Sequence, residues 1–460
     1  MLTCPAMEAA DSRWNHWRNW LRDSNNGRIL SAMLIVGGLS LVVNVAVIAR
    51  ELVLAAFFGV GDAVDAFLIA FALPAFAMNV LAGSMGVALL PILVRVREQS
   101  GAEAAQNLVS STVRVAAVVL LLVAGLLGVC GPVLLPWLGS NFTPAKLALT
   151  YEMYLWLLVP IVLHGINRVW AGVLNAHERF GVVAVSPIVI ALASVALLLI
   201  FHEQYGVRPL AWGAVVGYVL ETLWIAWGVT KLGYSISFRW GGATPELRSL
   251  ANQYGVLILG AVLMSGIVLV NQSMAAGLPP GSVSVLNYGN KLVTFVVGLG
   301  SLAVGSAVLP HFSRMVVAAD WRGLRRTLRL YFVLLVGVTV PVTVLLCWQS
   351  QAIVSMIYQR GKFTAADSEI VARVQTLALI QVPFQIVAIL GVRLLSACSR
   401  NDVLLLISGL NLAVTTIANL LLIGTWGVAG ISLATSIMVA ISTCCIFAAL
   451  TRELRRRETA

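Results

Sequence analysis

Residues 48–91 read IARELVLAAFFGVGDAVDAFLIAFALPAFAMNVLAGSMGVALLP, two apolar segments joined by the short hinge at 59–61. The stretch also carries the charged residues Arg50, Glu51, Asp62 and Asp65. Charges at or inside the ends of membrane helices are costly, so they usually face a protein interior or a water-filled cavity. The stretch therefore predicts two membrane helices whose charged residues belong to a polar site.

The whole chain has the composition of a membrane protein, 60% hydrophobic and 11% charged over 460 residues. A helix that spans a bilayer needs about 20 mostly apolar residues. Twelve such runs lie near 29–49, 63–94, 107–137, 148–174, 181–201, 209–230, 253–278, 283–312, 328–349, 370–396, 402–424 and 427–450. The expected fold is an all-α polytopic membrane protein with about twelve transmembrane helices.

The formal net charge of +11 comes mainly from arginines and lysines in the connections on one side of the predicted spans. Such a bias marks the cytoplasmic side, so we expect both termini in the cytoplasm. It also explains the charge without a nucleic-acid partner. Residues 1–28, with Trp14, Trp17 and Trp20 on one face, have the pattern of an interfacial amphipathic helix. The six cysteines show neither metal-ligand spacing nor a disulfide framework, so no metal site or cofactor is predicted.

The chain also repeats itself. Residues 86–91 and 305–310 match at an offset of 219, and residues 174–179 and 395–400 match at an offset of 221. Six spans per repeat would give two halves of the same orientation, related by an axis along the membrane normal. The predicted organisation is an amphipathic segment at 1–28, a six-helix lobe at 29–230, a cytoplasmic connection at 231–252, a second six-helix lobe at 253–450 and a basic cytoplasmic tail at 451–460.

Several motifs resemble the MurJ/MviN family. They are Ala49-Arg50-Glu51 and the Asp65-Ala66-Phe67 that follows it, the Arg-Gly-Lys-Phe within 358–367, and the segment 427–436. Members of that family belong to the multidrug/oligosaccharidyl-lipid/polysaccharide exporter superfamily. They are taken to flip lipid II, the undecaprenyl-diphosphate-linked peptidoglycan precursor, across the bacterial inner membrane. The resemblance implies two six-helix lobes that form a V around a central cavity, and transport by alternating access.

The chain departs from the family where the cavity is most cationic. The family has arginine at the position of Asn44, an Arg-Arg pair at Met78-Asn79 and an Asp-Arg pair at Asn290-Lys291, and its common members carry fourteen spans. Within this resemblance two cargoes stay open, lipid II and a lipid-linked exopolysaccharide repeat unit. A third hypothesis is an ion-coupled exporter of small molecules. Such a pump would favour acidic residues in the cavity over Arg50 and Lys291.

A flippase for such a lipid must move a diphosphate and a glycan past about 30 Å of hydrocarbon. Arg50 and Lys291 are the best cationic partners, because arginine suits bidentate phosphate contact and lysine acts as a point charge. Asp65 is expected to neutralise Arg50 when no substrate is bound. The predicted substrate-binding residues are Arg50, Asp65, Lys291, Asn44, Asn79 and Asn290, and the predicted gate is Gly361, Lys362 and Phe363.

Two alternatives to these assignments remain open. Arg50, Glu51 and Asp65 can be interfacial residues, and the segment 361–363 can be a purely structural turn. The outer connections are short and poor in catalytic acids and bases, so we do not expect an enzyme. No nucleotide-binding loop appears in the sequence, which leaves a substrate gradient, the membrane potential or a coupling ion such as Na⁺ or H⁺ to drive transport.

Overall fold

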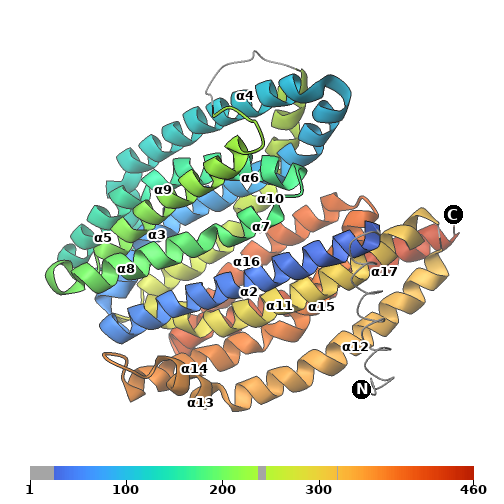
Figure 1. The fold of residues 1–460 in the computed structure, drawn as a ribbon. Helices are drawn as coiled ribbons and strands as arrows, with labels where there is room; N and C mark the ends of the chain where they lie inside the picture. Colours follow the sequence, from blue (N-terminus) through green and yellow to red (C-terminus); the bar gives the residue numbers. More distant parts are fainter. Residues whose placement is uncertain (1–24, 237–244, 319, 460) are drawn as a thin grey trace, which may run out of the picture.

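The computed structural model describes residues 25–236, 245–318 and 320–459, and these residues are helical almost throughout (Figure 1). The amphipathic helix predicted for residues 1–28 lies almost wholly outside the described residues. In chain order the helices are α2 (Asn25–Phe58), α3 (Asp62–Ala77), the π-helix η1 (Met78–Gly83), α4 (Ser84–Leu138), α5 (Pro144–Leu157), α6 (Val159–Ala176), α7 (Phe180–Val185), α8 (Pro187–Tyr205), α9 (Pro209–Thr230), α10 (Pro245–Ala276), α11 (Ser282–Val317), α12 (Trp321–Trp348), α13 (Ser350–Tyr358), α14 (Ala365–Leu379), α15 (Gln381–Ala397), α16 (Asn401–Trp426) and α17 (Val428–Thr459).

Ten stretches of the described chain are long and apolar enough to cross a membrane. One of them, Asp62–Leu138, has 77 residues and turns at Gly101, where the backbone leaves the helical conformation with φ 84°. Its two arms count as separate crossings, and α11 adds another 36-residue helix. Each of the twelve predicted spans therefore lies on helices of the described chain. Helix α17 continues to Thr459, so the basic tail predicted from residue 451 is helical.

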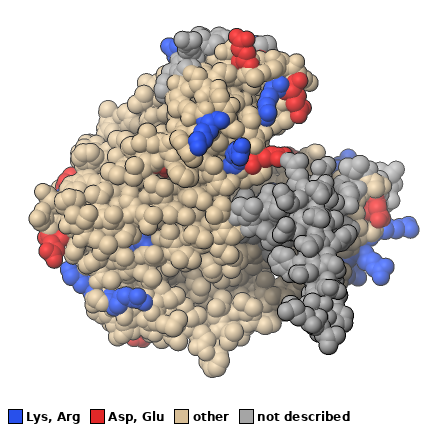
Figure 2. Space-filling view, in the orientation of Figure 1, with Lys and Arg blue, Asp and Glu red and all other residues tan. Residues whose placement is uncertain are grey.

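The outer surface of the protein is suited to lipid. Leu122, Val129 and Leu421 are 69%, 80% and 73% exposed, and large apolar side chains in such numbers on the outside are expected where lipid replaces water as the solvent. On the face shown in Figure 2, charged side chains lie mostly towards the ends of the molecule and leave a broad area without them. This distribution agrees with a bilayer around the middle of the helices.

Three hydrophobic cores show how the two lobes are joined. One core is formed mainly by α3–α9, including Leu89, and also takes in Leu250 near the start of α10, and a second lies within α11–α17 and includes Leu390. The third contains Leu54 of α2, Ile69 of α3 and Tyr288 of α11, and so belongs to both lobes. In Figure 1 the helices meet near the α2–α3 and α13–α14 turns and spread apart towards the C-terminus. We call the end at the α2–α3 turn the closed end.

The backbone reproduces the internal repeat. Glu178 and Ser399, which follow α6 and α15, have positive φ angles of 59° and 62°. Gly206 and Gly427, which follow α8 and α16, have φ angles of 60° and 56°. Both pairs are 221 residues apart, the offset seen in the sequence. Helices α6–α9 therefore correspond to α15–α17 of the second lobe.

Helices α8 and α9 approach closely because α9 presents glycine to α8. A Cβ atom added at Gly213 would lie 2.5 Å from the Cα of Ser194, and one added at Gly217 would lie 2.6 Å from the Cα of Ile190. Small residues four apart allow such contact between membrane helices. We expect Gly217→Val to destabilise the protein by about 1–3 kcal/mol, because overpacking forces the helices apart.

The measurement is the thermal unfolding midpoint of the purified protein in detergent. Gly125→Val on α4 is the matched control, since a Cβ at Gly125 meets nothing within 4 Å. Equal midpoints for the two variants would contradict the close packing of α8 on α9.

Candidate functional site

A cavity of about 510 Å³ lies between the lobes. Its walls come from α2, α3, η1, α8 and α9 of the first lobe and from α10 and α11 of the second. Apolar side chains, among them Phe67, Phe71 and Met264, form much of the surface. The polar side chains that line it are Arg50, Glu51, Asn79, Tyr218, Ser265, Gln272, Asn287 and Lys291.

The centre of this polar lining is the carboxylate of Glu51, which is 2% exposed. Its Oε1 accepts a hydrogen bond from Arg50 Nη2 at 2.7 Å and another from Lys291 Nζ at 3.2 Å. Its Oε2 accepts one from Asn287 Nδ2 at 3.2 Å. Arg50 belongs to the first lobe and Lys291 to the second, so Glu51 joins cations from both. Two cations against one carboxylate leave the cluster with a net positive charge.

The helices explain this geometry. Asn287 and Lys291 are four residues apart on α11, so they share the face turned towards α2. The side chains of Arg50 and Lys291 are each 26% exposed, whereas Glu51 is buried behind them. A buried carboxylate without cations would be strongly unfavourable, because removing one partner of a buried pair leaves an uncompensated charge. Both cations therefore stabilise the buried carboxylate.

The structure brings three of the six predicted substrate-binding residues to this cavity: Arg50, Lys291 and Asn79. Asn44 is exposed on α2 and does not line it. The side-chain amide of Asn290 donates to the Leu286 carbonyl of its own helix at 2.9 Å. The pairing predicted between Asp65 and Arg50 is wrong: Glu51 neutralises Arg50, and Asp65 has other partners.

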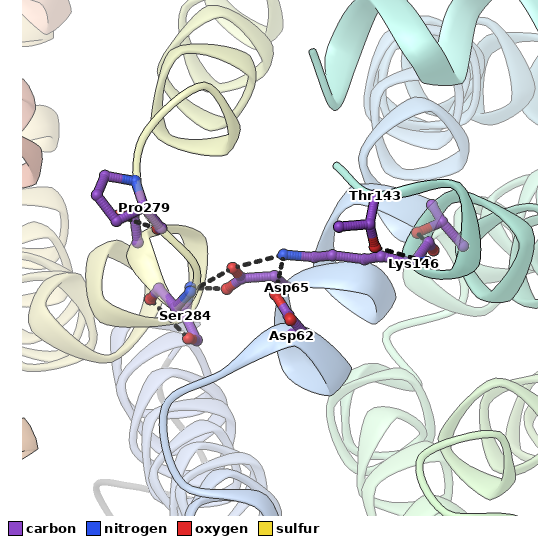
Figure 3. A network of polar contacts seen from close by, with 9 residues as sticks. Asp62, Asp65, Thr143, Lys146, Pro279 and Ser284 are labelled. Atoms are coloured by element: carbon purple, nitrogen blue, oxygen red, sulfur yellow. Dashed lines mark hydrogen bonds and ion pairs between the residues drawn. The ribbon is translucent and has the colours of Figure 1, made fainter. Parts of the chain in front are cut away.

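Asp65 lies at the closed end, in the first turn of α3, and is 1% exposed. Its Oδ2 contacts Lys146 Nζ of α5 at 3.1 Å and accepts from the backbone N–H of Gly281 at 2.7 Å. Its Oδ1 accepts from the backbone N–H of Ser284 at 2.8 Å (Figure 3). The first N–H groups of a helix have no partner within the helix and carry a positive partial charge. One carboxylate thus fastens α3 of the first lobe to the start of α11 in the second.

Besides Glu51, the predicted site residues lack Lys146 of α5. It is 8% exposed and binds Asp62 Oδ1 at 2.7 Å as well as Asp65. A signal was present: Phe142-Thr143 before Lys146 repeats as Phe363-Thr364 before Asp367, again at an offset of 221. In both places the threonine hydroxyl accepts a hydrogen bond from the backbone N–H three residues later.

The predicted gate segment 361–363 also lies at the closed end. The backbone N–H of Lys362 donates to the Ala56 carbonyl of α2 at 2.8 Å. Gly361 has φ 60°, and a Cβ there would collide with the same carbonyl oxygen. Phe363 is 2% exposed and packs against the rings of Tyr288 and Tyr358. This loop of the second lobe is therefore seated on the end of α2.

The described residues contain no group of three or more histidine, cysteine, aspartate or glutamate side chains that could hold a metal ion. The polar side chains of the cavity offer ionic and hydrogen-bonding contacts. They can bind an anion between two cations and offer amides to the hydroxyl and amide groups of a ligand.

The two aspartates in the first turn of α3 provide a matched test of the closed end. Both bind Lys146, but the side chain of Asp65 is 2% exposed and that of Asp62 is 57% exposed. We expect Asp65→Ala to lower stability by about 3–5 kcal/mol, because Lys146 and two backbone N–H groups lose a buried partner. Asp62→Ala should cost only about 0–1 kcal/mol, as is usual for an exposed pair.

Denaturant unfolding in mixed micelles, followed by tryptophan fluorescence, measures both variants. Lys146→Met is a third variant, and it should fall between them because Asp65 keeps its two backbone donors. If Asp62→Ala proved as damaging as Asp65→Ala, burial of the Asp65 carboxylate would not be the source of the stability.

Comparison with known proteins identifies the family. The family model described as lipid II flippase MurJ matches residues 54–459. The lipid II flippase MurJ of Burkholderia cenocepacia is 28% identical over 362 residues, which are 75% of this chain and 69% of that protein. The probable lipid II flippase MurJ of Rhizobium tropici is 25% identical over 360 residues, which are 75% of this chain and 66% of that protein. The match thus spans about two thirds of each relative.

Solved structures agree with this result at the level of the fold. A lipid II flippase MurJ in an inward closed conformation superposes with a TM-score of 0.79 at 19% identity, covering 91% of this chain and 87% of the other. An inward-facing MATE family transporter of the MOP superfamily superposes with a TM-score of 0.75 at 13% identity, covering 93% and 99%. The fold is that of a two-lobe transporter, and the chain belongs to the MurJ family of multi-pass membrane proteins.

Proposed function

We propose that this chain carries lipid II, an undecaprenyl-diphosphate-linked glycan, across the bacterial inner membrane by alternating access, without altering it chemically. The observation that carries the proposal is the cluster of Arg50, Glu51 and Lys291 in the cavity between the lobes. Membership of the MurJ family supports the cargo. The predicted lobes, 29–230 and 253–450, are the two bodies that move, and the connection 231–252 joins them.

The cluster suits a diphosphate because Arg50 and Lys291 are already paired with the carboxylate of Glu51. Arg50 and Lys291 both contact Oε1 of Glu51, so a ligand must compete with that oxygen for them. A singly charged anion gains little from the exchange. A diphosphate presents several charged oxygens and can contact both cations at once, with the strength of charge-assisted hydrogen bonds. The carboxylate therefore favours ligands with more than one negative charge.

The rest of the cavity fits the groups next to the diphosphate. Asn79, Gln272 and Asn287 offer amide donors and acceptors to sugar or peptide groups. The volume of about 510 Å³ falls within the range of about 300–1,000 Å³ that is usual for small-molecule sites. It accommodates the diphosphate and the adjoining sugar, while the polyprenyl tail stays in the lipid.

The closed end acts as the outer gate in this proposal. With the N-terminus in the cytoplasm, the α2–α3 turn faces the periplasm. Opening that side requires Asp65 to leave the N-terminus of α11 and Lys362 to leave the Ala56 carbonyl. Gly361, Lys362 and Phe363 are therefore proposed gate residues together with Asp65 and Lys146.

Replacing either cation should abolish function without preventing insertion. We expect Arg50→Ala and Lys291→Ala to fail in a strain depleted of its own lipid II flippase, because each leaves one cation for the diphosphate. Lys291→Arg, which keeps the charge, should retain partial activity. Growth after depletion is the measurement, with membrane-fraction immunoblots to confirm that each variant accumulates.

Arg208→Ala is the matched control, since Arg208 forms a half-exposed pair with Glu152 away from the cavity. Normal growth with both Arg50→Ala and Lys291→Ala would overturn the role given to the cavity. Failure of the unaltered chain, combined with loss of an exopolysaccharide on deletion of its gene, would assign it the exopolysaccharide repeat unit instead.

A further inference from the structure

A carboxyl group is buried in the first lobe just behind the cavity wall. Glu221 lies in the middle of α9 and is 5% exposed. Its Oε1 is 2.8 Å from the hydroxyl of Ser186, and its Oε2 accepts from Asn167 Nδ2 at 3.0 Å. Both neighbours are neutral. Within the described part of the chain, Glu221 forms no ion pair.

The charged and titratable groups around Glu221 do not compensate an ionised carboxylate directly. Arg168 of α6 is close enough to act on it electrostatically, but its Nε donates to His164 Nε2 of the same helix at 3.2 Å. Tyr218 lies one turn earlier on α9. An ionised carboxylate without a paired cation is costly at the middle of a membrane helix. The neutral acid is the less costly form.

The hydroxyl of Ser186 supports the neutral form independently. Its Oγ lies 2.8 Å from Glu221 Oε1 and 3.1 Å from the Val183 carbonyl oxygen. A hydroxyl has a single hydrogen to donate but can also accept. The carbonyl oxygen of Val183 can only accept, so the contact with it uses the one hydrogen of Ser186. The contact with Glu221 is then also a hydrogen bond only if its hydrogen comes from a protonated Glu221. Both hydrogen bonds of Ser186 therefore form when Glu221 is a carboxylic acid, and only one of them can form when Glu221 is a carboxylate.

This position connects the carboxyl group with the cavity. Ser186 separates α7 from α8, and the next residue, Pro187, lines the cavity, as does Tyr218. Helices α7 and α8 both pack against α2, which carries Arg50 and Glu51. Loss of the proton would turn the Ser186 hydroxyl from Val183 to Glu221 and so change the break between α7 and α8.

We propose that Glu221 is a proton-binding site, occupied in the conformation described here and emptied when the first lobe rearranges. The ligand is a proton held by a carboxylic acid within the membrane. Only the link to transport rests on the proposed function. Binding of the proton is a property of the protein alone and can be tested without a cargo.

The test is infrared difference spectroscopy of the full chain in lipid nanodiscs as the pH is raised. The unaltered protein should show the carbonyl band of a protonated carboxylic acid at neutral pH, and Glu221→Gln should lose it. Glu152→Gln is the matched control, because Glu152 pairs with Arg208 and should contribute no such band. Ser186→Ala should keep the band but move it to higher frequency, because the acid loses its hydrogen-bond acceptor.

A band that persists unchanged in Glu221→Gln, or no band in the unaltered protein, would overturn the proposal. If Glu221→Gln does not fold, Ser186→Ala decides the test. A carbonyl band at the same frequency in Ser186→Ala as in the unaltered protein would then overturn the proposal. Cargo movement into vesicles tests the coupling: an imposed pH gradient should change the rate for the unaltered protein and not for Glu221→Gln. If the unaltered protein transports the cargo at the same rate with and without the pH gradient, the coupling to the proton is wrong, but the proposed cargo is not affected.

Discussion

The rest of the structure depends on the way that Glu51 holds one cation from each lobe. A buried carboxylate needs both Arg50 and Lys291, because removing a partner would leave a charge without compensation in a medium of low dielectric constant. In the absence of a ligand this requirement keeps α2 and α11 together across the cavity. An anion that enters can satisfy the same cations from the other side. In the proposed function, binding of such a ligand therefore also weakens the ion pairs that join the two lobes.

The same two helices connect the cavity to the closed end. Helix α2 carries Glu51 and, little more than one turn later, the Ala56 carbonyl that Lys362 binds. Helix α11 carries Lys291 and, two turns earlier, the Ser284 amide that Asp65 binds. A helix transmits a displacement along its axis because its backbone hydrogen bonds are internal. In the proposed function, a change at Glu51 therefore reaches both attachments of the closed end without contact between the cargo and that end.

The sequence predicted the parts of this arrangement that depend on one segment at a time. Apolar runs of the right length predicted the crossings, and charges within spans pointed to Arg50 and Lys291. The pairing predicted between Asp65 and Arg50 was wrong, because two residues close in the sequence were assumed to be close in space. The partner of Asp65, Lys146, is 81 positions away. Glu51 was not predicted as a site residue for a related reason. Adjacent residues on a helix face different directions, and only the packing of α11 against α2 shows that Glu51 is the residue that contacts Lys291.

The repeat shows where the two similar lobes differ in their contacts at the closed end. Thr143 and Thr364 occupy equivalent positions and accept the same backbone hydrogen bond. In the second lobe the residue three positions later, Asp367, completes a capping box on its own helix. In the first lobe that residue is Lys146, which reaches instead to Asp65 on α3. The threonine cap is therefore kept in both lobes, but the residue that completes the capping box in the second lobe is replaced in the first by one that ties α5 to α3. Asp65 also fastens α3 to the start of α11, so the first lobe carries an attachment that has no equivalent at Asp367 of the second lobe; in the proposed function this is the attachment that breaks when the closed end opens.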